Sequence, residues 1–387
     1  MKTKYTLIAA AAIGMLSSTA SAVDWGGYTR VGPAQKTTTG GDSNRCFNGG
    51  ANGGKGGIGR LGNECDTYGE FGLSQSATAG GVTYKALMMA NFYRGGESQA
   101  AGIATSVNQI YVEAKGFNVA PNQTFWIGER FYHRADVHMD DNFFVNMSGT
   151  GAGVDGFNLG FGSLSAAVFR KGDSSGNPGS RLNLDLEGIN VNPGGKLRVS
   201  AVFTDFSGAA GTSGTGISLQ HNQSGILGGD NTLWLQYAQG SAGLDQNFGD
   251  GTGASGKKSW RIVESPAWVN GPLSGQALLQ LGVDKEANGN EKKYSSIGGR
   301  VAFALSQNFK LQGEAGVSRM TPVQGASSQQ VTKVTVAPTL TVGQNYYDRP
   351  ELRLYVSGFQ FNSAYQLANG LTKSSKTSVG FQAEIWF

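Results

Sequence analysis

Side chains that could bind a solute are concentrated in one stretch, residues 128–154, near the middle of the chain. It holds two of the three histidines, paired aromatic residues, and the charged residues Arg134, Asp136 and Asp141, and it ends in Gly-rich turns. Two interpretations stay open from the local sequence. The stretch is either an exposed loop with solvated charges or a loop folded into the lumen of a membrane barrel, where rings of charge select solutes.

Metal and enzyme chemistry fit this chain less well. His133 and His138 stand five residues apart in an irregular segment, which is poor spacing for metal ligands. The aspartates at 136, 140 and 141 lack the ordered pattern and closing glutamate of a calcium loop. Gly172–Gly176 fits G-x-S-x-G, but the strand-to-helix context of a nucleophile elbow is missing. We therefore expect no metal, no cofactor and no enzyme activity.

The composition and the first residues indicate how the rest of the chain is built. The chain has 61 glycines, 9 prolines and only 15% charged residues, a mixture typical of many strands joined by flexible turns. Lys2 and Lys4, an apolar run, and Ala20-Ser21-Ala22 predict a signal peptide over residues 1–22. Residues 23–387 then form one domain without an apolar run of the about 18 residues that a membrane helix needs. The formal charge of +4 falls by two with those lysines, too little to indicate a nucleic-acid partner.

The strand signal is alternation with a period of two. It is clear over Arg181–Glu187, Lys196–Phe203 and Asn308–Ser318, where apolar residues occupy one face and polar residues the other. A soluble sandwich also alternates. However, about eighteen such segments, with short turns alternating with long loops, favour an all-β, transmembrane antiparallel barrel. Loops are expected over 31–65, 94–107, 133–152, 239–256 and 362–373.

The last segment, Val379–Phe387, alternates most clearly. Its apolar face ends in Phe387, while Trp386 lies on the other face together with Glu384. An open sheet edge in lipid would leave backbone groups unpaired, so we expect this strand to close the barrel against the first one. Trp386 then points into the lumen, where a large flat ring indicates a binding role.

Two cysteines remain after export, Cys46 and Cys65. In an oxidising compartment we expect them to form a disulfide within the first loop, which would stabilise the fold by roughly 3 kcal/mol in the chain-entropy model. A mass spectrum of unreduced peptides would test this pairing.

Several of these segments resemble the maltoporin family of sugar-specific outer-membrane porins. The matching pieces are VDWGGYTR at the start of the mature chain, RLGNECDTYGE at 60–70, ERFYHRADVHM with SGTGAG at 129–153, NPGG at 192–195, DRP at 348–350 and AEIWF at the end. The resemblance implies a homotrimer of barrels with about 18 strands each, embedded in outer-membrane lipid and narrowed by an inward-folded third loop. It also implies an aromatic slide, along which sugars pass between charged residues.

The family's functional residues carry over by motif. Tyr28, Tyr68 and Trp386 match slide residues, and Tyr347 stands where the family has another slide tryptophan. Without the resemblance, each tyrosine would fit an interfacial girdle better. The matching polar-track residues are Arg30, Arg60, Glu70, Arg134, Asp136 and Asp141.

This chain departs from the family at four places. Phe143 replaces the constriction tyrosine, and Asn108 stands where a track arginine is expected. The loop tryptophan that reaches a neighbouring subunit has no counterpart between Arg94 and Val107. The lowest slide phenylalanine aligns near Asp230, although Trp234 lies on the same face. The sequence thus predicts a channel for sugars, whether maltodextrins or other di- and oligosaccharides. A general diffusion porin for small solutes is the alternative.

Overall fold

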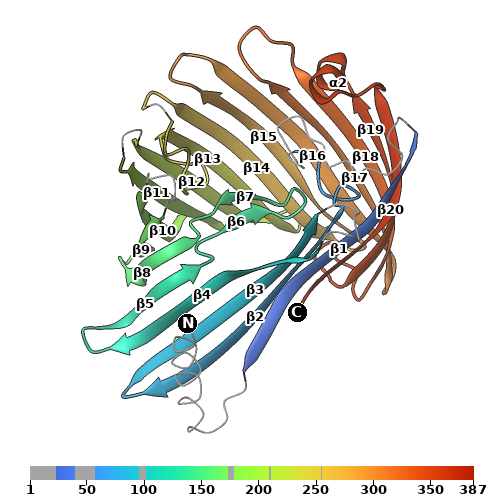
Figure 1. Cartoon of the computed structure of the whole chain (residues 1–387). Helices are drawn as coiled ribbons and strands as arrows, with labels where there is room; N and C mark the ends of the chain where they lie inside the picture. Colours follow the sequence, from blue (N-terminus) through green and yellow to red (C-terminus); the bar gives the residue numbers. More distant parts are fainter. Residues whose placement is uncertain (1–22, 40–56, 96–101, 173–177, 209–210, 254) are drawn as a thin grey trace.

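The chain forms a closed antiparallel β-barrel (Figure 1). The computed structural model describes residues 23–39, 57–95, 102–172, 178–208, 211–253 and 255–387. Eighteen strands form one sheet, and β1 pairs with both β2 and β20, which leaves no free edge. The prediction of an all-β barrel with about eighteen strands, closed by its last strand, is confirmed.

The barrel strands are β1 (Asp24–Thr39), β2 (Asp66–Ala79), β3 (Val82–Gly95), β4 (Ala104–Phe117), β5 (Ala120–Arg130), β8 (Gly149–Asn158), β9 (Ser163–Lys171), β10 (Gly179–Asn192), β11 (Gly195–Phe206), β12 (Ser213–Ile226), β13 (Gly229–Gly240), β14 (Lys258–Asn270), β15 (Leu273–Lys285), β16 (Glu291–Ser306), β17 (Phe309–Thr321), β18 (Gln329–Thr341), β19 (Glu351–Phe361) and β20 (Ser375–Trp386). A second, two-stranded sheet consists of β6 (Ala135–Val137) and β7 (Asn142–Val145). The helix α2 (Ser363–Asn369) begins at the N-cap Asn362 and ends at Gly370. No helix in the described ranges is long and apolar enough to cross a membrane.

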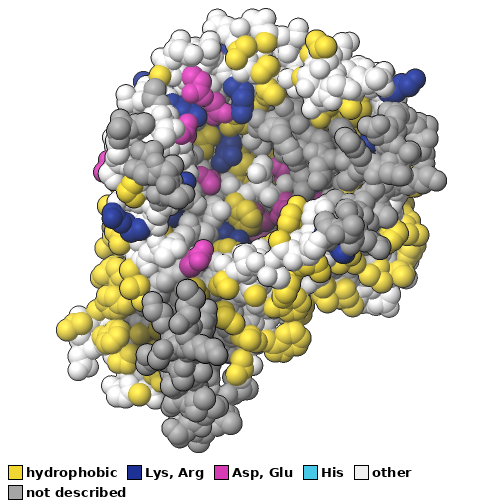
Figure 2. Space-filling model, viewed as in Figure 1, with side chains coloured by type: hydrophobic (Ala, Val, Ile, Leu, Met, Phe, Trp, Pro, Cys, Tyr) yellow, Lys and Arg dark blue, Asp and Glu magenta, His cyan; other side chains and the backbone are white. Residues whose placement is uncertain are grey.

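The barrel wall carries its hydrophobic side chains on the outside and its polar side chains on the inside, the reverse of a soluble protein. On β10, Leu182 is 38% exposed, whereas its neighbours Arg181 and Asn183 are buried inside the barrel. Figure 2 shows hydrophobic side chains over the outer wall and charged side chains inside the opening. This pattern suits a wall with lipid outside and a polar lumen within.

Short turns and long loops lie at opposite ends of the barrel, as predicted. β10 and β11 join through a pair of residues, 193–194, and β14 and β15 through 271–272. The boundaries of some loops differ from prediction: β1 runs to Thr39, so the first loop begins at residue 40 rather than 31, and the loop after β19 contains α2. Short turns mark the periplasmic end of such barrels.

The third loop, residues 131–148, folds into the lumen, where β6 and β7 form a hairpin (Figure 1). Its underside is apolar, because Val137, Met139 and Phe144 are fully buried there. They pack in one cluster with Trp126 of the wall strand β5 and with Tyr346 of the turn 342–350. The apolar underside of this loop takes the place of a conventional core, and the prediction of an inward-folded third loop is confirmed.

A second segment, residues 57–65 at the end of the first loop, also lies in the lumen. The sequence predicted a loop over 31–65, and within 57–65 only the family resemblance, through Arg60, indicated a residue that faces the channel. Leu61 N–H donates to Glu314 Oε1 at 2.9 Å, and Lys333 Nζ donates to the Leu61 carbonyl at 2.8 Å. A Cβ at Gly59 would stand 2.3 Å from the Glu314 carboxyl carbon, so only glycine allows the backbone to lie this close to the wall. Cys65 is buried in this segment, while Cys46 lies outside the described residues, and the disulfide stays a prediction.

Candidate functional site

A hollow of about 380 Å³ lies inside the barrel where the first and last strands meet. Residues of β1, β2 and β20, one residue of the first loop and residues of the third loop line it. Its lining consists of Tyr28, Arg30, Arg60, Tyr68, Glu70, Arg134, Asp136, His138, Asp141, Phe143 and Trp386. Most of the residues predicted from the sequence as slide or polar track are therefore brought together at one place.

The closing seam of the barrel sets the positions of the strand residues. Tyr28 on β1 is in register with Trp386 on β20 and with Glu70 on β2. Arg30 is likewise in register with Tyr68 and Glu384. Side chains directly opposite each other on adjacent strands lie within contact range, so residues from both ends of the sequence share one patch of wall.

Aromatic rings follow the seam from one end of the hollow to the other. The ring centroids of Tyr28 and Tyr68 are 6.2 Å apart. Trp386 is 38% exposed, and the Arg349 guanidinium lies 4.5 Å from its ring centroid. Tyr347 lies beyond the lining of the hollow. It is 43% exposed on the turn 342–350, and its ring centroid is 5.8 Å from that of His138.

Two arginines of the hollow are held by carboxylates. Arg30 donates to Asp66 at 2.7 and 2.9 Å and to Asp141 at 2.7 Å, which ties the wall to the third loop. Arg60 pairs with Glu64 and Glu384, each at 3.0 Å. Bidentate and multiple pairing fixes a guanidinium in one orientation. These arginines thus form a rigid polar edge beside the rings.

Arg134 is held differently. Its guanidinium carbon lies 3.9 Å from the centroid of the Phe131 ring and 4.4 Å from that of Phe143. Within the described ranges it makes no ion pair. Two cation–π contacts therefore position a charge whose N–H donors remain available to a solute. Asp136 lines the same hollow, and burial, followed by the nearby charge of Asp141, raises the pKa of its carboxyl.

A β-bulge explains how Asn108 reaches this site. The register of β3 and β4 shifts there, between Met89 and Ala90, so that Asn108 and Gln109 both reach lumen groups. Asn108 Nδ2 donates to the Tyr68 hydroxyl at 3.2 Å and to Glu70 Oε1 at 3.3 Å. Gln109 Oε1 accepts from the Phe131 N–H of the third loop at 2.8 Å.

Trp234 requires a correction. It lies on the lumen face of β13, as expected, but only 3% of it is exposed. The third loop covers it, and its ring centroid is 5.3 Å from that of Phe144. A covered ring cannot offer a face to a passing solute, so Trp234 supports the loop and does not belong to the slide.

The histidines and aspartates of the third loop do not converge on one site. His138 Nε2 lies 2.8 Å from Arg349 Nη2, and burial lowers the pKa of His138 to about 3, so it is neutral. Asp140 is buried and accepts from the Gly57 N–H at 2.7 Å and from Asn142 at 3.0 Å. Of the G-x-S-x-G stretch, Asp173–Gly176 lie outside the described residues.

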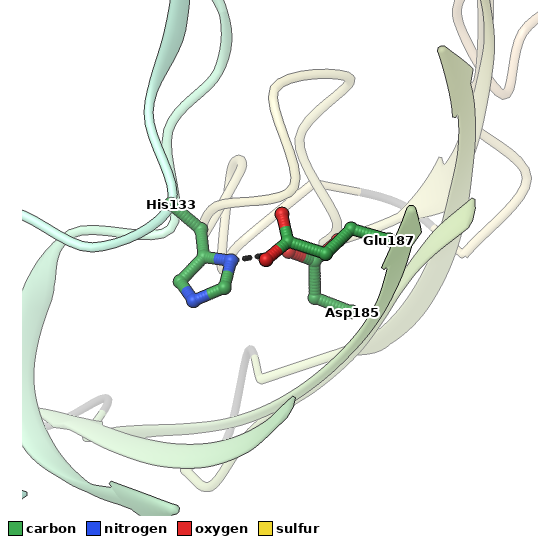
Figure 3. Close-up of side chains that lie close together, drawn as sticks. All are labelled: His133, Asp185 and Glu187. Carbon is green, nitrogen blue, oxygen red and sulfur yellow. Dashed lines mark hydrogen bonds and ion pairs between the residues drawn. The ribbon is translucent and has the colours of Figure 1, made fainter. Parts of the chain in front are cut away.

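His133, Asp185 and Glu187 form a cluster that the sequence did not suggest (Figure 3). Their ligand atoms lie within 4.8 Å of one another, close enough to surround a metal ion. Asp185, however, already accepts from Arg198 at 2.8 Å and from Ser200 at 2.6 Å, in addition to its contact with His133 Nδ1. We interpret the His133–Asp185 contact as an anchor of the third loop on β10.

Tyr93 is a lumen residue that sequence reasoning missed. It is in register with Tyr68, and it is 45% exposed. Tyr93 lies two residues after Asn91 on β3, closer to the end of the barrel that carries the long loops. It extends the series of aromatic rings in that direction. The same period-two test that placed Tyr28 and Trp386 would have found it, because Asn91 and Tyr93 share a face.

The closed wall, the inward loop and the polar hollow define a porin-type channel of the outer membrane. The chain belongs to the LamB porin family, whose sequence model, described as LamB porin, matches residues 23–387. A protein of Hahella chejuensis named maltoporin is 31% identical over 411 residues, which cover 98% of this chain and 96% of that protein.

Solved structures share the fold at low identity. OccAB1 of Acinetobacter baumannii matches with a TM-score of 0.53 at 12% identity, over 94% of this chain and 96% of that one. OccD3 (OpdP) of Pseudomonas aeruginosa matches with a TM-score of 0.52 at 12% identity, over 96% of this chain and 92% of that one. Family membership makes the protein a channel.

Proposed function

We propose that this channel carries sugars across the outer membrane by facilitated diffusion. The observation that supports this most is the seam hollow, where Tyr28, Tyr68 and Trp386 line one wall beside fixed charged groups. The relative named maltoporin supports the same solute class.

The chemistry of a pyranose fits such a wall. Its C–H faces are apolar and stack on aromatic rings, while its rim carries hydroxyls that donate and accept hydrogen bonds. Arg134 offers donors and Glu70 offers an acceptor at the edge of the same hollow. Binding must be weak and repeated along the path, because a solute has to leave as well as enter. Tyr347 would receive the sugar after Trp386.

A general diffusion porin is the second candidate. It would share the barrel and the inward loop, and its constriction would also carry opposed charges. It has no use for exposed rings arranged along one seam, whereas Trp386 and Tyr347 are 38% and 43% exposed inside this lumen. The ring series therefore favours the sugar channel.

Current block by sugars in reconstituted channels tests the proposal. Trp386→Ala and Tyr68→Ala should each weaken the block several-fold, because loss of one ring stack costs on the order of 1 kcal/mol. Ion conductance should stay similar or rise. Tyr84→Ala is a matched control, because Tyr84 lies on the outward face of β3, away from the lumen, and is 36% exposed. If both lumen variants bind sugar like the wild type, the protein is a general porin.

We also propose that the channel is a homotrimer, as the family resemblance implies. Crosslinking of the protein in native outer membranes would test this by the mass of the largest product. A species no larger than one chain would contradict it.

A further inference from the structure

A second hollow, of about 570 Å³, lies at the periplasmic end of the barrel, away from the seam. The turn 159–162 and the ends of β10, β11 and β12 line it. It faces the lumen, because its lining residue Arg198 donates to the His133 carbonyl of the third loop at 3.0 Å. Its volume falls within the range of about 300–1,000 Å³ typical of small-molecule sites.

Two β-bulges shape this hollow. The pairing of β10 with β11 shifts between Leu186 and Ile189, and that of β8 with β9 shifts between Val154 and Phe157. Bulges bend a strand and re-aim its side chains, and they are common next to functional sites. Here both occur where the strands reach the periplasmic end. Glu187, which lines this hollow, lies beside the contact that His133 makes with Asp185 (Figure 3).

The lining combines one exposed ring with unpaired charges of both signs. Phe161 is 59% exposed on the turn 159–162. Glu187 and Lys196 are exposed in the same hollow, and neither makes an ion pair or a side-chain hydrogen bond with any described residue. Glu187 lies two residues beyond Asp185 on β10, beside His133 (Figure 3). Asn222 and Gln220 add amide groups at the far edge.

We propose that this hollow is a second carbohydrate-binding site, on the opposite wall from the slide, which receives a pyranose unit at the periplasmic mouth. The ring of Phe161 takes an apolar sugar face, the Glu187 carboxylate accepts from hydroxyls, and the Lys196 ammonium donates to them. A weak site at the exit lowers the barrier to leaving the constriction, because the sugar exchanges one set of contacts for another. The inference rests on the proposed sugar transport.

Sugar added to one side of a planar bilayer separates this site from the slide. The test compares the rate constant of maltotriose block from the periplasmic side with that from the external side, in channels inserted with one orientation. Phe161→Ala and Glu187→Gln should each lower the periplasmic rate constant by roughly three- to tenfold. The external rate constant should stay within about twofold of the wild-type value.

Leu227→Ala is the matched control, since Leu227 is 70% exposed on another periplasmic turn and lies outside the lining of the hollow. Unchanged periplasmic rates in both test variants, or equal losses from both sides, would overturn the second site and leave the slide intact. If neither maltotriose nor any other di- or oligosaccharide blocks the wild-type channel from either side, the proposed function itself fails.

Discussion

Two arginines of the seam hollow carry the same charge but are held by different forces. Arg60 is buried between Glu64 and Glu384, whereas Arg134 lies between two phenylalanine rings without an ion pair among the described residues. The first guanidinium therefore stabilises the wall, and the second is available for solute.

This difference predicts that the same substitution weakens sugar binding at one position and the stability of the barrel at the other. Arg134→Gln should weaken sugar block several-fold, because a charged hydrogen bond is worth roughly 1.5–3 kcal/mol and a neutral one about 0.5–1.5 kcal/mol. The thermal stability of the barrel should hardly change. Arg60→Gln should destabilise the barrel by roughly 3–5 kcal/mol, because it removes a partner of buried carboxylates. Melting in detergent and sugar titration on both variants check this, and equal losses of stability would contradict it.

Phe143 lines the hollow and Asn108 bonds to two of its lining residues, and both are positions where the sequence is expected to depart from the family. Phe143 offers a ring without a hydroxyl, and Asn108 offers a neutral amide that already bonds to Tyr68 and Glu70. We expect millimolar, broad sugar binding without a steep gain as the oligosaccharide lengthens. Phe143→Tyr combined with Asn108→Arg should sharpen the preference for longer maltodextrins, since charged donors bind hydroxyls more strongly.

Titration of wild type and double variant with glucose through maltohexaose would measure this preference. The single variants serve as controls that separate the hydroxyl from the guanidinium. A steep dependence on length already present in the wild type would show that these two positions do not set selectivity.

At the scale of elements, Asp140 joins the first loop to the third. Its carboxyl accepts the Gly57 N–H, and burial raises its pKa to about 6. Because the folded-state pKa exceeds that of the unfolded chain, the protonated carboxyl favours folding. This contribution is complete below about pH 4 and is lost as the pH rises through about 6.

Asp140→Asn should remove this pH dependence while it retains an acceptor for Gly57. The wild type should lose on the order of 2 kcal/mol relative to the variant between pH 4 and pH 7. Melting temperatures in detergent across this range would test the prediction, and parallel curves for the two proteins would refute it. Asp205→Asn is a suitable control, because Asp205 is an exposed acidic residue near the end of β11.

The elements themselves were largely predictable, because alternation depends only on the local backbone. Tyr28 with Arg30, and Trp386 with Glu384, fall on common faces by period alone. No comparable pattern in the sequence indicates where the loops dock inside the barrel. Residues 57–65 are Gly-rich and aperiodic, although they lie deep in the lumen, and Trp234 has the expected face but is covered by Phe144. The bulge that turns Asn108 inward is likewise set by pairing with β3.

At the scale of the whole molecule, closure depends on the contact between the two chain ends. Gly27 and Phe387 exchange backbone hydrogen bonds of 2.9 and 3.1 Å. On the outer face, the Phe387 ring lies 5.0 Å from the Trp25 ring and 5.8 Å from the Phe71 ring, between centroids. The ring contacts therefore stabilise the seam in addition to its backbone hydrogen bonds.

Phe387→Ala should lower the temperature at which the folded barrel loses its distinct mobility on a gel, because it removes two ring contacts worth about 1 kcal/mol each. Phe381→Ala is the matched control on the same strand, since Phe381 is 50% exposed to the outside and lacks a described ring partner. An equal shift in both variants would mean that lipid exposure, and not the seam, sets the effect.

The seam location of the hollow also links the site to closure of the barrel. Tyr68 and Glu70 stand on β2, whereas Trp386 and Glu384 stand on the last strand, β20. The hollow is therefore complete only where the two ends of the chain are paired. A barrel that is open at this seam lacks one side of the hollow, so any solute recognition at this place requires the same pairing that seals the wall.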